Sequence, residues 1–186
     1  MDNLILGNTM IGTPIDVIPY VRGIQLVLTG YSGYTKGKRR EADKIIRDEI
    51  VRASNRARNH VLNIHDNTFR DGDVISTRAA KSCLEEIDAF MEDVRKSMTG
   101  MDHAFLSGLR SASNSDLKKL IKHDHEVIEM VTKAVNISNS AEQALAIGIG
   151  DVKGITRQCQ QMISSCRGFY GSRVKLLGGI RQKRKV

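Results

Sequence analysis

The chain has 186 residues, of which 40% are hydrophobic, 27% are charged and 4% are aromatic. This balance excludes an intrinsically disordered chain, and a chain of this length can form a folded core without disulfides or metal ions. The 29 Lys and Arg outnumber the 21 Asp and Glu, and the formal net charge of +8 favours acidic partners such as nucleic acid or an anionic membrane surface.

Residues 1–37 differ in composition from everything that follows. They hold both prolines, six of the sixteen glycines and almost no charge before Lys36. Because glycine and proline favour turns and irregular backbone, we expect an irregular apolar N-terminal arm. Residues 24–28 form its one stretch with a pattern that suits a short helix or strand.

From residue 38 onward, apolar residues recur at alternating steps of three and four, which predicts amphipathic helices. The first helix is expected over 38–65 and the second over 75–99. Between them, residues 66–73 show no period and include Gly72, so we expect a loop there.

The second half of the chain predicts two further long helices. A short helical segment over 102–110 precedes the first of them, which is expected over 116–137. The last helix is expected to begin after residues 138–140, a run of Ser, Asn and Ser that favours helix caps. Its apolar residues continue to Phe169.

About four long amphipathic helices with short connections pack most simply as a bundle, so the fold class is expected to be all-α. We expect three parts, which are the arm over 1–37, the helical bundle over 38–177 and a short basic C-terminal tail over 178–186. The apolar stripes are narrow, and they suit either a tight bundle or contact with a second chain.

Positive charge gathers in the first helix and near the C-terminus. Residues 36–58 contain nine bases and four acids, and residues 167–186 contain seven bases and no acid. Such clusters favour contact with phosphate groups, whereas the alternative for the first helix is a solvated face whose charges pair along the helix. The candidate anion-binding or nucleic-acid-binding residues are Arg39, Arg40, Lys44, Arg47, Arg58, Arg181, Lys183, Arg184 and Lys185.

One acidic residue occupies a core position. Asp124 lies on the apolar stripe between Ile121 and Ile128, so its carboxylate is expected to be buried. A buried carboxylate must be paired, and we expect a His or Arg from another helix to meet it and to fix the helix register. His123 and Glu126 leave open a buried metal here, but the sequence lacks the Glu-x-x-His pairs of bundle metal sites, and we expect neither metal nor cofactor.

The three cysteines are Cys83, Cys159 and Cys166, and all three lie in apolar helical contexts. They show neither Cys-x-x-Cys spacing nor a disulfide framework, which indicates core packing in a reducing compartment. Without a recognisable secretory signal, the expected localisation is cytoplasmic, with peripheral attachment to a membrane left open.

No catalytic motif is present, and we do not expect an enzyme. The leading interpretation is a structural or assembly subunit, a self-associating bundle whose arm docks on another chain or a membrane and whose basic surface holds an anionic partner. Its expected partners are further copies of the chain or other proteins, without a small-molecule substrate. The alternatives are a nucleic-acid-binding accessory protein without sequence specificity and a bundle enzyme with a buried metal near Asp124.

Overall fold

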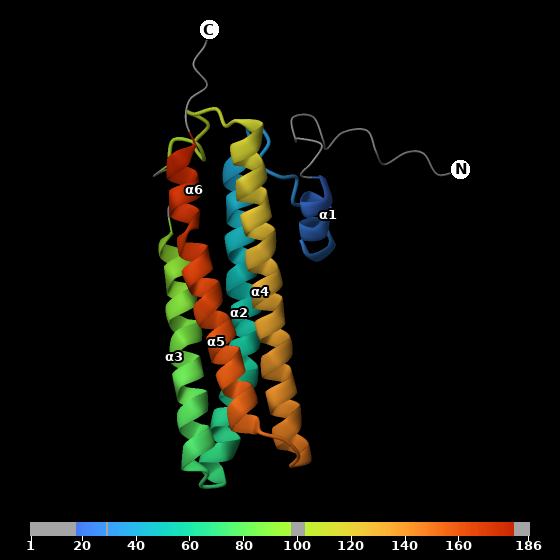
Figure 1. The fold of residues 1–186 in the computed structure, drawn as a ribbon, viewed down its shortest axis with the longest axis vertical. Helices are drawn as coiled ribbons and strands as arrows, with labels where there is room; N and C mark the ends of the chain where they lie inside the picture. The colour runs from blue at the N-terminus through green and yellow to red at the C-terminus, as the bar shows by residue number, and fades with distance from the viewer. Residues whose placement is uncertain (1–17, 29, 98–102, 181–186) are drawn as a thin grey trace, which may run out of the picture. The chain divides into compact units, whose positions relative to one another are not determined.

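The computed structural model describes residues 18–28, 30–97 and 103–180, and all regular secondary structure in these ranges is helical (Figure 1). The predicted all-α class is therefore confirmed. The helices are α1 (Ile18–Val27), α2 (Arg39–Arg70), α3 (Val74–Lys96), α4 (Asn114–Ile147), α5 (Val152–Gly171) and α6 (Arg173–Gly179).

The chain forms two compact units, and α2 and α4 each contribute residues to both. Unit 1 comprises Met1–Ile46, Met98–Glu126 and Ser172–Val186, and unit 2 comprises Arg47–Ser97 and Val127–Gly171. The apolar stripe predicted for the first helix is buried along its whole length. Its members are Ala42, Ile46, Ile50, Ala53, Ala57, Val61 and Ile64.

Unit 2 is built from four helical segments around one core. Its parts of α2 and α3 form one antiparallel hairpin, and its part of α4 forms a second with α5 (Figure 1). Side chains join each segment to two others, so that the four close a ring. The joining contacts are Arg58 with Asp88 for α2 and α3, His60 with Glu142 for α2 and α4, Phe90 with Tyr170 for α3 and α5, and Cys166 with Val127 for α4 and α5.

The loop predicted over 66–73 is shortened to 71–73, and the break predicted at 138–140 is wrong, because polar side chains there bond to their own helix. Helix α2 continues into the expected loop as far as Arg70, and the buried Thr68 hydroxyl donates to the Ile64 carbonyl at 2.9 Å. Helix α4 likewise runs unbroken through 138–140, and the Ser138 hydroxyl donates to the Val135 carbonyl at 2.8 Å. Serine and threonine that bond back in this way are compatible with a helix interior.

The turns of unit 2 lie where glycine permits a left-handed backbone. Gly72 has a φ of 73° in the α2–α3 turn, and Gly148 and Gly150 have φ values of 66° and 106° in the α4–α5 turn. Such values are costly for residues with a Cβ. Asp73 then caps α3 by accepting from the backbone N–H groups of Ile75 and Ser76.

Unit 1 contains the second half of the predicted arm, which is helical over 18–27 and irregular over the described residues from 28 to 38. Residues 18–27 form α1, and Gly23 lies so close to His125 of α4 that a Cβ there would clash with the imidazole ring. Residues 103–110, expected to be helical, form turns instead. The arm's buried side chains are Val21, Ile24, Leu28, Tyr31 and Tyr34.

Residues 1–17 of the predicted arm and residues 181–186 of the predicted tail lie outside the described residues. The division into arm, bundle and tail therefore stays a prediction. The compact units follow different boundaries, since each gathers segments that are distant in sequence.

Candidate functional site

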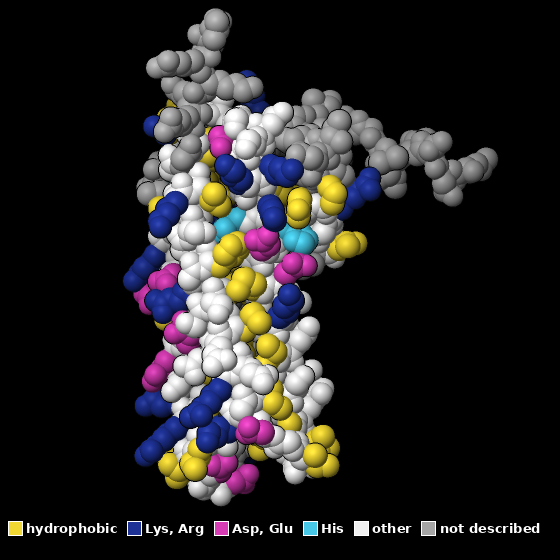
Figure 2. All heavy atoms as spheres, viewed as in Figure 1, with side chains coloured by type: hydrophobic (Ala, Val, Ile, Leu, Met, Phe, Trp, Pro, Cys, Tyr) yellow, Lys and Arg dark blue, Asp and Glu magenta, His cyan; other side chains and the backbone are white. Residues whose placement is uncertain are grey.

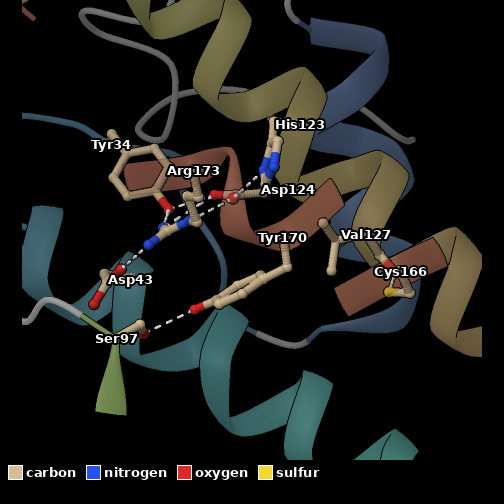
Figure 3. A network of polar contacts seen from close by, with 9 residues as sticks. All are labelled: Tyr34, Asp43, Ser97, His123, Asp124, Val127, Cys166, Tyr170 and Arg173. Carbon is tan, nitrogen blue, oxygen red and sulfur yellow. Dashed lines mark hydrogen bonds and ion pairs between the residues drawn. The ribbon is translucent and has the colours of Figure 1, made fainter. Parts of the chain in front are cut away.

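The most polar part of the core of unit 1 is centred on one arginine. Arg173, the first residue of α6, is only 2% exposed, and its guanidinium lies between two carboxylates (Figure 3). Its Nη1 donates to Asp43 at 2.7 Å and its Nε to Asp124 at 2.9 Å. Its Nη2 donates to the Tyr34 hydroxyl at 2.6 Å, and that hydroxyl in turn donates to Asp124.

This arrangement keeps Asp124 ionised. Burial alone would raise the pKa of Asp124, but the charge and hydrogen bonds of Arg173, together with His123, outweigh it and lower the pKa. Burial also raises the pKa of Tyr34 well above its ordinary value, so the phenol keeps the proton that it donates. Asp124, Arg173 and Tyr34 therefore form a hydrogen-bonded network in which Asp124 stays ionised and Tyr34 stays protonated.

The burial and the cationic partner predicted for Asp124 are confirmed, and the partner is an arginine. The Nδ1 atom of His123 lies 3.5 Å from the same carboxylate. Arg173 was not predicted as this partner, because it lies among the seven bases of residues 167–186, which together favour contact with phosphate groups. The predicted burial of Asp124, which requires a cationic partner, was the signal that could have identified Arg173. The role of Asp124 in fixing the helix register stays a prediction.

A second polar feature of unit 1 is a cavity of about 290 Å³ at the start of α2. Arg39 and Arg40, both predicted anion-binding residues, contribute to its wall. Facing them is the turn that contains Ser107. The complete lining is Gly37, Arg39, Arg40, Leu106, Ser107 and Gly108.

The guanidinium of Arg39 meets only neutral acceptors among the described residues for which contacts are resolved. Its Nη1 donates to the carbonyls of Phe105 at 3.1 Å and Arg110 at 2.6 Å, and its Cζ lies 4.4 Å from the centroid of the Phe105 ring. Its Nε is buried and has no hydrogen-bond partner in the described part of the chain. Burial lowers the pKa of Arg39, as expected for a cation that no carboxylate offsets.

The other predicted basic residues are not brought to this cavity. Lys44 is exposed on α2 in unit 1, whereas Arg47 and Arg58 belong to unit 2. Arg58 donates to Asp88 of α3 at 2.8 Å, which is a pair between two helices and not the pairing along one helix that the alternative expects. Arg181, Lys183, Arg184 and Lys185 lie outside the described residues.

Unit 2 exposes apolar side chains around its two turns. We call this group the apolar tip and define it as Phe69, Val74, Ile75, Ile147 and Ile149. One cavity is lined by residues from both hairpins at this end, and Asp73 of the first turn lies close enough to Lys153 for their charges to interact. Figure 2 shows apolar side chains on the surface at this end of unit 2, among charged ones of both signs.

The cysteines lie in the core of unit 2. Cys83, Cys159 and Cys166 are all free and buried, which confirms the packing role predicted for them. The hydrogen bond that Cys83 donates to Cys159, together with burial, raises the pKa of Cys83 and lowers that of Cys159, and burial raises the pKa of Cys166 to about 12. Cys83 and Cys166 therefore stay protonated and unreactive.

Within the described ranges, no three side chains of His, Cys, Asp and Glu gather in a way that could hold a metal ion. None of the described helices has the length and apolar content needed to cross a bilayer. Comparison of the chain with protein-family models, with curated proteins and with solved structures gives no match.

Proposed function

We propose that the chain is a non-catalytic assembly subunit that associates with further copies of itself through the apolar tip and holds an anionic partner at the basic cavity of unit 1. The observation that carries the proposal is the apolar tip. Its five side chains are 56–72% exposed, and they make up most of the eight large apolar side chains that are exposed in the described part of the chain.

The size of the tip indicates weak, reversible association. Full burial of one large apolar side chain contributes about 1.5–3 kcal/mol, so covering five that are more than half exposed contributes on the order of 5–10 kcal/mol. Association costs roughly 4–15 kcal/mol in lost freedom, which leaves little net free energy. We therefore expect a concentration-dependent oligomer with a dissociation constant in the micromolar range or weaker.

The charges around the tip favour a second copy over an anionic membrane. The charged residues at the two turns are Arg70, Asp71, Asp73, Asp151 and Lys153, which are of mixed sign. A membrane surface rich in anionic lipid attracts clustered cations, which this end lacks among its described residues. A twofold interface brings the same patch of two copies together, so that acids of one copy can face cations of the other.

The network around Arg173 supports a binding role over catalysis. Both oxygens of Asp124 accept hydrogen bonds from Arg173 or Tyr34, so the carboxylate that the metal-enzyme alternative requires is already engaged. The nucleic-acid alternative stays a prediction, since four of its nine residues lie outside the described ranges.

Size-exclusion chromatography with light scattering tests the role of the tip. Phe69→Ser should lower the measured mass at a concentration where the wild type is partly associated. Leu26→Ser is the matched control, because Leu26 is 89% exposed but lies on α1 in unit 1. Equal masses for the wild type and Phe69→Ser at every concentration, or an equal loss in Leu26→Ser, would contradict the proposal.

A further inference from the structure

The cavity at the start of α2 combines space with positive charge. Its volume is about 290 Å³, and two of its six lining residues are arginines. Residues 36–40 add Lys36 and Lys38 next to them and contain no acid. The opposite wall is held in place by its own backbone, since the N–H groups of Ser107 and Gly108 donate to the carbonyls of His103 and Phe105.

The positive charge of Arg39 at this cavity is not compensated by a carboxylate among the described contacts. Its charge faces two backbone carbonyls and an aromatic ring, and its buried Nε has no partner among the described residues. A partly buried cation with neutral neighbours pays a desolvation cost that an anion within hydrogen-bond distance of the guanidinium would offset. Arg40 is exposed at the same wall and can turn toward such an anion.

We propose that this cavity binds the phosphate group of a small ligand, either inorganic phosphate or a phosphate monoester. This inference rests on the anion-holding part of the proposed function and names its ligand class. Guanidinium groups match the oxygens of phosphate with paired N–H donors, and the two positive charges of Arg39 and Arg40 match a dianion. Ser107 donates its hydroxyl to the Ala104 carbonyl, so the arginines supply the recognition.

The surroundings favour a small ligand over a nucleic-acid strand. Single strands are held by rows of cations together with aromatic faces on which bases stack. Here the nearest aromatic ring, Phe105, is buried and covered by the guanidinium of Arg39. Arg58, predicted for the same surface, is engaged by Asp88 in unit 2.

Calorimetric titration of the full chain with inorganic phosphate at low ionic strength tests this site, with acetate as the control anion. Arg40→Gln should weaken phosphate binding about tenfold or more, since a hydrogen bond between charged groups contributes that much. Lys44→Gln is the matched control, because it removes the same charge from an exposed position of α2 outside the cavity lining. Arg39→Lys keeps the charge but loses the planar donor pair, and it should also weaken binding.

Three results would overturn the inference. These are no phosphate binding by the wild type, equal binding of acetate, and an equal loss in Arg40→Gln and Lys44→Gln. Binding to vesicles with phosphatidate headgroups without binding of inorganic phosphate would also refute a small ligand. The circular dichroism of each variant shows whether it is folded. The titration measures phosphate binding at the cavity, whereas light scattering measures association through the apolar tip. A negative result in one experiment therefore does not contradict the proposal that the other tests.

Discussion

Replacement of Arg173 by methionine is the sharpest perturbation of the core of unit 1. The change removes the guanidinium that pairs with both Asp43 and Asp124, and both carboxylates are 1% exposed. If Asp124 then takes up a proton at pH 7, the shift from an ordinary carboxyl pKa of 3.8 costs about 4 kcal/mol. This agrees with the roughly 3–5 kcal/mol lost when one partner of a buried ion pair is removed.

Urea denaturation followed by circular dichroism measures this loss, and amide hydrogen exchange locates it. We expect the amides of unit 1 to lose more protection than those of unit 2. The double variant Arg173→Met/Asp124→Asn should recover part of the stability, because one buried charge is removed along with its partner. A loss below about 1 kcal/mol, or no recovery in the double variant, would refute the reasoning that a buried ion network holds this core.

Three further predictions concern single residues. Because Arg173 lowers the pKa of Asp124, the carboxylate stabilises the fold above its ordinary pKa of 3.8, and this contribution is lost progressively as the pH falls further. Asp124→Asn should therefore cost more stability at pH 7 than at pH 3 in urea titrations, and an equal cost at both would contradict this. Tyr34→Phe should lower the melting temperature by removing a donor to Asp124, whereas Tyr31→Phe should leave it unchanged or raise it, because the buried Tyr31 hydroxyl has no partner among the described residues. Gly148→Ala should destabilise by about 1 kcal/mol because its φ is 66°, whereas Gly168→Ala, inside α5 with open space around it, should stabilise by a similar amount in the same assay.

The periodic parts of the fold could be predicted because burial alone determines them. The stripe of α2 and the burial of Asp124 follow from spacing, since residues three and four apart share one face of a helix. The start of α3 near residue 75 follows from the glycine and aspartate before it.

The remaining features depend on contacts between distant segments, which spacing does not encode. Ser138 and Ser140 are typical of a helix cap, yet they lie inside α4 because their hydroxyls bond back to carbonyls of the preceding turn. The glycines of the predicted arm indicate irregular backbone, but Gly23 lies inside α1, where a Cβ would clash with the His125 ring. Arg173 belongs to a basic stretch by composition, and only the fold shows that two buried acids surround it.

The proposed phosphate site at the start of α2 was only partly predictable, because it also depends on contacts between distant segments. Arg39 and Arg40 were identified from their local charge, but the wall that contains Ser107 and Gly108 comes from a segment about seventy residues later in the chain. The apolar tip was not predicted, since Phe69 and Ile147 lie in separate hairpins and only their exposure in the folded unit identifies them.

Sedimentation equilibrium of the wild-type chain over a wide range of concentrations tests self-association most directly. We predict a weight-average mass that rises from one chain toward two as concentration increases. This association should persist at high salt because the tip is apolar. The double variant Phe69→Ser/Ile149→Ser should stay at the mass of one chain. A wild-type chain that remains monomeric at every concentration would contradict the claim that this protein assembles through its apolar tip.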